Sequence, residues 1–181
     1  MERGFTLVEL LVTITLLALL LALAVPGLSG MAERQASDST QANIRRLLSA
    51  GREAAIQQNA VTTVCPSRDG SQCSGNWQDT WLVFSDPNGN RTVDSGEAIL
   101  LRWQPDARVR FVSRPATLQA IQWSPSGITA GTFGSLIWCA GGAKQTLRQV
   151  SVTLQGRIRA IQDTDGDGIR DVSLIPATCA G

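Results

Sequence analysis

One long apolar stretch near the start of the chain restricts its fold more than any other feature. Between Leu10 and Val25 only two threonines are even mildly polar, and after Glu9 no charged residue appears until Glu33. Counted from Phe5, the stretch has about the twenty apolar residues that a helix needs to cross a bilayer. A carboxylate at the edge of such a span is costly, so Glu9 requires a specific partner.

Two simpler explanations account for this stretch less well. A secretory signal peptide would have a more basic start than MERG and a shorter apolar run, and ALAVPG offers only a weak cleavage site. A plain membrane anchor fits the length but gives Glu9 no role.

Beyond this stretch the pattern changes to an amphipathic helix and then to short strands. Pro26, Gly27 and Gly30 predict a kink or a loosening of the helix. Apolar and small residues then recur at three- and four-residue spacing, at Ile44, Leu47, Leu48, Gly51, Ala54 and Ala55. The helix is predicted to end near Asn59. Turn signals separate the strand-like runs that follow: VTTVC, TWLVF, AILLRW, RVRFV, LQAIQW, SLIWC, RQVSVTL and RIRAI.

This order of elements predicts an α+β fold, in which one long N-terminal helix packs on an antiparallel β-sheet head. The predicted organisation is a transmembrane helix over 5–30, its amphipathic half over 31–59 and a β-rich head over 60–181.

The composition disfavours an active site. The chain has no His and no Tyr. Without His, most metalloenzyme sites and any nucleophile that relies on a His base are disfavoured. The glycine-containing runs GAKQT and AGG are too short and misspaced for a phosphate-binding loop. We therefore predict that the protein is not an enzyme.

The run RGFTLVELLVTITLLALLLALAVP resembles the leader and N-terminal helix of type IV pilins and type II secretion pseudopilins. The resemblance implies a leader peptide over 1–4, cleavage between Gly4 and Phe5 by the prepilin peptidase, and N-methylation of Phe5. It also implies a partner for Glu9, the α-amino group of a neighbouring subunit. The physics agrees, because a charge in lipid is stabilised by one specific counter-charge, which a free Phe5 amine supplies.

The head is similar to that of the GspH/FimT group of minor pilins and pseudopilins, above all in the block TWLVFSDPNGNRTVDSGEAIL. The resemblance implies a minor subunit at or near a fibre tip, which assembles with other major and minor pilins or pseudopilins. It implies a single-pass protein of the inner membrane with its head in the periplasm, or at the cell surface once in a fibre. The sequence does not separate a type IV pilus from a type II secretion machine.

The cysteines suit an oxidising compartment, where disulfides persist. Four Cys allow three connectivities. Cys65 and Cys73 bracket a short loop, so local pairing is easy, and Cys139 and Cys179 would then tie the C-terminal tail to a central strand. The alternative is that some are buried thiols. A zinc site is disfavoured because there is no His and no CxxC spacing.

Two acidic stretches have the spacing of calcium-binding loops. The first places oxygen ligands at positions one, three, five, seven, nine and twelve: Asp86, Asn88, Asn90, Thr92, Asp94 and Glu97. However, Arg91 stands where an EF-hand loop has Gly, and an Asx- and Gly-rich hairpin turn explains this stretch as well. The second stretch lacks the bidentate Glu but carries Asp163, Asp165, Asp167 and Asp171. Calcium is thus the one candidate cofactor.

Basic residues gather in the middle of the chain. From Arg102 to Arg159 there are eight Arg or Lys against one acid. In the last strand-like run Arg157 and Arg159 share a face, and Ile158 points the other way. An arginine guanidinium binds phosphate oxygens with two parallel hydrogen bonds, so this face suits an anionic partner.

The Gly-Arg-x-Arg pattern at 156–159 resembles the C-terminal motif of DNA-binding FimT-type minor pilins used in natural transformation. The resemblance implies weak DNA binding without sequence preference. The candidate residues are Lys144, Arg148, Arg157 and Arg159. Two alternatives stay open: the arginines form a solvated strand face, paired with Asp163 or Asp165, or the protein is a purely structural tip or priming pseudopilin of a type II secretion system.

Overall fold

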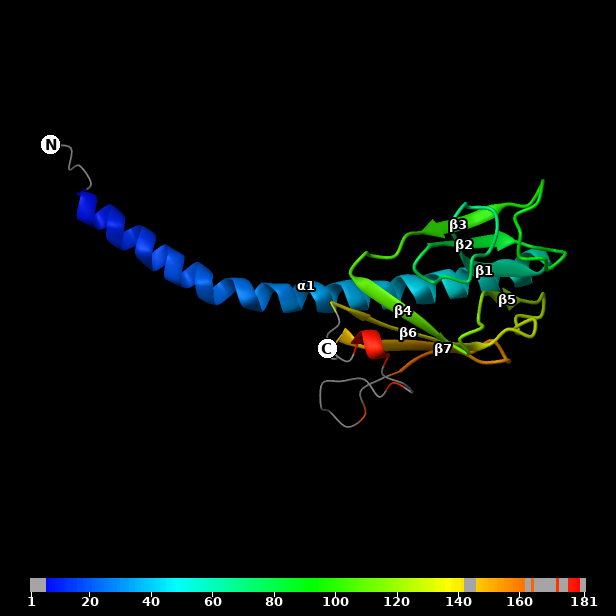
Figure 1. Cartoon of the computed structure of the whole chain (residues 1–181). Helices are drawn as coiled ribbons and strands as arrows, with labels where there is room; N and C mark the ends of the chain where they lie inside the picture. The colour runs from blue at the N-terminus through cyan, green and yellow to red at the C-terminus, as the bar shows by residue number, and fades with distance from the viewer. Residues whose placement is uncertain (1–5, 142–145, 162–163, 165–171, 173–175, 180–181) are drawn as a thin grey trace.

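A computed structural model describes residues 6–141, 146–161, 164, 172 and 176–179. Its first element is a single helix, α1 (Leu7–Gln58), which begins at a capping box on Thr6 and ends at Asn59 in the left-handed conformation. The helix continues through Pro26 without interruption. Figure 1 shows it gently curved, with its first half projecting away from the head. The predicted kink or loosening is therefore a curve, and the helix does not break.

The head contains two antiparallel sheets. The first has the order β3 (Ile99–Trp103), β2 (Thr80–Ser85), β1 (Thr62–Ser67) and β5 (Ile121–Trp123). The second has the order β4 (Val109–Arg114), β6 (Gly134–Ala140), β7 (Arg148–Val152) and β8 (Ile158–Ala160). Each strand overlaps one of the runs named above, and the α+β fold with a helix on antiparallel strands is confirmed. A short 3₁₀ helix, Ala177–Cys179, follows.

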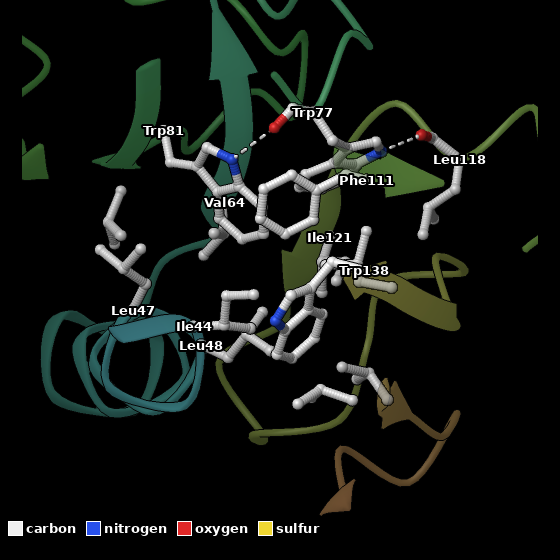
Figure 2. Packing of buried hydrophobic residues seen from close by; sticks show 14 of the residues in the cluster. Ile44, Leu47, Leu48, Val64, Trp77, Trp81, Phe111, Leu118, Ile121 and Trp138 are labelled. Carbon is white, nitrogen blue, oxygen red and sulfur yellow. Dashed lines mark hydrogen bonds between the residues drawn. The ribbon is translucent and has the colours of Figure 1, made fainter. Parts of the chain in front are cut away.

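The core lies between the second half of α1 and the inner faces of both sheets. Ile44 and Leu48 are fully buried there. Figure 2 shows them facing a layer of aromatic rings, in which the indole N–H of Trp81 donates to the Trp77 carbonyl at 3.0 Å. The indole N–H of Trp77 donates in turn to the Leu118 carbonyl at 2.8 Å. The predicted amphipathic half thus supplies one wall of the core.

Disulfides join Cys65 to Cys73 and Cys139 to Cys179, the two pairs that the sequence spacing favoured. The first closes the loop after β1, where the backbone N–H groups of Gln72 and Ser71 hold the pKa of Asp69 well below its usual range. The second ties β6 to the C-terminal 3₁₀ helix.

Within the described residues, the structure has no helix that combines the length and the apolar character needed to span a membrane. The division of the chain at residues 30 and 59 stays a prediction.

Candidate functional site

The start of α1 holds the one acid of the apolar stretch. The Glu9 carboxylate accepts hydrogen bonds from the backbone N–H of Thr6 at 3.1 Å and from its hydroxyl at 3.0 Å. The backbone N–H of Glu9 donates to the Thr6 hydroxyl at 3.2 Å, which completes the capping box. The large apolar residues from Leu7 to Leu21 are each at least 50% exposed. Glu9 is therefore a capped carboxylate on an otherwise apolar, uncovered helix, while Gly4 and Phe5 lie outside the described residues.

A cleft of about 450 Å³ lies between the second half of α1 and the edge strand β8. Its lining residues are Arg45, Ser49, Arg52, Gly156, Arg157, Ile158 and Arg159. Arg157 and Arg159 are exposed and alternate with the half-buried Ile158, as the strand pattern predicted. The turn before β8 is held by Thr153, whose carbonyl accepts from the Gly156 N–H at 2.9 Å.

The cleft is strongly basic because four arginines line it and no acid does. The ion pairs found within the described residues involve other arginines: Arg68 with Asp79, Arg108 with Asp106, and Arg148 with Asp38. In the second pair, hydrogen bonds from the Arg108 side chain lower the pKa of Asp106 to about 2. The charges of the cleft arginines are thus not neutralised by a described acidic side chain.

One of the four candidate DNA-binding residues, Arg148, does not lie in the cleft. Arg148 is only 7% exposed, and its guanidinium makes a 2.8 Å ion pair with Asp38 of α1. This arginine therefore fixes β7 to the helix and does not belong to the exposed basic surface. Lys144, like Asp163 and Asp165, lies outside the described residues.

Sequence reasoning missed Arg45 and Arg52, which lie more than a hundred residues before β8 in the chain. The available signal was their spacing of seven, which places both on one side of a helix, at the edge of the stripe that Ile44 and Leu48 bury.

Comparison with known proteins assigns the chain to a family. Residues 40–156 match the family described as type II transport protein GspH, and residues 1–25 match the prokaryotic N-terminal methylation motif. The chain belongs to the GspH family. It is a minor pilin or pseudopilin of a type IV pilus or a type II secretion fibre, and its family is structural and not enzymatic.

Relatives of this GspH-family protein agree with that assignment. It is 32% identical over 167 residues to the pilin-like protein PilA1 of Thermus thermophilus, covering 87% of this chain and 97% of the relative. The crystal structure of the type IV minor pilin FimU from Pseudomonas aeruginosa PAO1 covers 83% of this chain and 97% of that one, with a TM-score of 0.53. A second crystal form of FimU covers 70% and 90%, with a TM-score of 0.50. At 16% identity these structures show the shared fold.

The methylation motif has direct consequences for the GspH-family chain. It implies processing by the prepilin peptidase, anchoring in the inner membrane before fibre assembly, and assembly with other pilins. The exposed apolar side chains of α1 suit those surroundings, because a helix that is apolar on its outer surface needs lipid or other helices to cover it.

The first acidic stretch of this pilin forms a tightly hydrogen-bonded turn after β2. The buried Asp86 carboxylate accepts from the Thr63 hydroxyl at 2.6 Å, from the Gln122 amide at 3.2 Å, and from the backbone N–H groups of Asn90 and Arg91 at 3.0 and 3.1 Å. Four donors therefore already occupy the oxygens that a cation would need.

The remaining predicted ligands of this loop also bond within it. The Asp94 carboxylate accepts from the side-chain amides of Asn88 and Asn90 at 2.9 and 2.8 Å, and Glu97 accepts from the Asp94 N–H at 3.0 Å. Across the described residues no group of three or more acidic or Cys side chains forms a metal centre. The hydrogen bonds favour the hairpin-turn interpretation. The second stretch, 163–171, lies almost wholly outside the described residues, and calcium there stays a prediction.

Proposed function

We propose that this minor pilin binds the phosphate backbone of DNA through the arginine cleft between α1 and β8. The observation that carries the proposal is the set of four arginines on one cleft with no acid among its lining residues. A basic groove releases condensed counterions when it binds a nucleic acid, which favours binding at low salt.

The cleft suits backbone binding without sequence preference. Its described lining residues include no aromatic side chain on which bases could stack. The β8 arginines lie on an edge strand of only three residues, which offers no element of the size that enters a major groove to read base edges. Guanidinium groups along this cleft therefore contact phosphates, and such contacts carry no sequence information.

The proposal includes how the subunit reaches the fibre. Cleavage between Gly4 and Phe5 frees the Phe5 amine, and the Glu9 carboxylate of one subunit pairs with the amine of its neighbour. The exposed apolar residues of α1 support this role, since they need other helices to cover them in the fibre. The head then faces the periplasm, or the cell exterior once the fibre extends.

A purely structural pseudopilin of a type II secretion system is the competing function. It requires only the exposed first half of α1, Glu9 and a folded head, and it leaves the arginine cleft without a ligand. The two functions differ in one measurable property, the affinity of the head for duplex DNA.

The test uses the full chain in non-ionic detergent and a fluorescently labelled duplex, with fluorescence anisotropy measured from low to high salt. We expect binding at low salt that weakens steadily as salt rises. Arg157→Gln with Arg159→Gln should lower the affinity at least tenfold and leave the melting temperature nearly unchanged, because both side chains are exposed.

A matched control removes two exposed arginines of α1, Arg34→Gln with Arg46→Gln, which lie outside the cleft. Their loss changes the net charge equally and should weaken binding by less than about threefold. A wild-type protein that fails to bind at low salt, or equal losses in the two double variants, would leave the structural pseudopilin as the function.

A further inference from the structure

We infer that the cleft is a two-walled phosphate site, in which Arg45 and Arg52 of α1 contact the same polyanion as Arg157 and Arg159, and in which Arg52 orders both walls. The inference rests on the proposed function for its ligand. It adds the helix wall, which the Gly-Arg-x-Arg pattern does not contain.

Arg52 is held in place before any ligand arrives. Its Nε–H donates to the carbonyl of Gly127, in the loop between β5 and β6, at 2.7 Å, and the side chain is half-buried. The two Nη groups stay available, since this bond uses one donor of five. A fixed guanidinium loses less conformational entropy on binding than a free one, so Arg52 is suited to be the anchor of the site.

The glycine at position 156 lets β8 close against this anchor. Gly156 has φ +77°, and a Cβ there would overlap the Gly127 carbonyl oxygen and lie 3.3 Å from Nε of Arg52. It would also lie 3.1 Å from the Trp123 ring. Only glycine combines this backbone conformation with such a close approach. The turn before β8 therefore packs directly on Arg52, which brings the arginines on both walls to one cleft.

The spacing on the helix wall indicates the class of ligand. Arg45 and Arg52 are seven residues apart, roughly 10 Å along a helix axis, and Ser49 lies between them with an exposed hydroxyl. One strand of duplex DNA carries a phosphate for about every 3.4 Å of axis. Measured along the duplex axis, a span of roughly 10 Å covers about three such steps, so the helix wall suits a chain of phosphates better than a single phosphate group.

The experiment compares single variants along α1 in the full chain, again with labelled duplex in non-ionic detergent. Arg45→Gln and Arg52→Gln should each weaken binding roughly tenfold and reduce the slope of log affinity against log salt by about one. Arg46→Gln is the matched control, because this exposed arginine is one residue away on the same helix and outside the cleft. It should change the affinity by less than about twofold.

Arg52→Lys separates positioning from charge. Lysine keeps the positive charge but lacks the planar fork that binds the Gly127 carbonyl and a phosphate together. We expect an affinity between those of the wild type and Arg52→Gln. Because loss of Arg52 leaves a carbonyl without its donor, the melting temperature is recorded for each variant. No hydrogen bond joins the Arg45 side chain to another described residue, so Arg45→Gln tests the helix wall free of that complication.

A second probe, inorganic tripolyphosphate measured by calorimetry, separates this inference from DNA binding. One outcome is that the β8 double variant loses duplex binding while Arg45→Gln and Arg52→Gln bind duplex DNA as well as the control Arg46→Gln. In that case the two-walled site is wrong and the proposed function stands. If tripolyphosphate binds and requires Arg45 but duplex DNA does not bind, the phosphate site stands and the DNA function is wrong. Binding of neither probe overturns both.

Discussion

The two halves of α1 are built from similar apolar residues but lie in opposite surroundings. In the first half Leu17 is 58% exposed, whereas in the second half Leu48 is completely buried under the sheets. Both belong to the same uninterrupted helix. The difference shows that the apolar character of a side chain does not by itself determine what covers it. The sheets of the head pack on the second half of α1 and leave the first half uncovered.

The outward surfaces of the two halves also differ. The first half carries a single charge, Glu9, which is capped by its own helix. The second half presents Arg45 and Arg52 to a cleft that β8 completes. The second half therefore serves both the core and a binding surface, while the first half is left for the membrane and for other subunits, as the methylation motif implies.

The sharpest way to break this comparison is to place the same charge in each half. Leu48→Asp should cost more than about 5 kcal/mol of stability, because it removes a buried side chain and leaves an unpaired carboxylate in the core. Leu17→Asp should change the stability of the head by less than about 0.5 kcal/mol. Urea denaturation followed by tryptophan fluorescence measures both, since every Trp lies after residue 76. Equal losses in the two variants would show that the halves are not independent.

A smaller effect is expected from the disulfides of the head. Replacing Cys139 and Cys179 by Ser removes a cross-link with a sequence separation of 40, and on the chain-entropy model this costs about 4 kcal/mol. Replacing Cys65 and Cys73, with a separation of 8, should cost about 2.5 kcal/mol. The same denaturation measurement compares the two pairs. A larger loss for the short loop would mean that local packing around β1 outweighs loop entropy.

A change at Glu9 is expected to have the smallest effect on the stability of the head. It is expected to have a large effect on assembly into the fibre. Glu9→Ala should leave the unfolding of the head unchanged, because this end of α1 projects away from the described part of the head (Figure 1). Incorporation into sheared fibres should be lost, because the amine of the neighbouring subunit loses its counter-charge.

Glu9→Gln distinguishes charge from capping, since it keeps an oxygen that can accept from Thr6. The salt-bridge account expects this variant to be excluded from fibres as well. Normal incorporation of either variant, scored by immunoblot of the sheared fraction, would contradict that account.

The sequence by itself determined every feature that repeats over a short range. The unbroken apolar run, the three- and four-residue spacing from Ile44 to Ala55, and the strand-like runs predicted the long helix and the antiparallel strands. These patterns reflect local geometry, namely side-chain periodicity and turn chemistry, and so they can be read without the rest of the chain. The short loop between Cys65 and Cys73 indicated their pairing for the same reason.

Only the tertiary structure decided which distant residues share a site. It placed the buried Arg148 in an ion pair with the partly exposed Asp38, 110 residues earlier, and so took this arginine out of the predicted basic surface. It also set Arg45 and Arg52 beside β8. It gave the Asp86 carboxylate hydrogen bonds from Thr63 of β1, 23 residues earlier, and from the backbone of its own turn. The physical reason is common to these cases. A charged side chain pairs with the groups that the packing of the core places near it. That packing joins segments far apart in the chain, and no periodic pattern in the sequence marks such pairs.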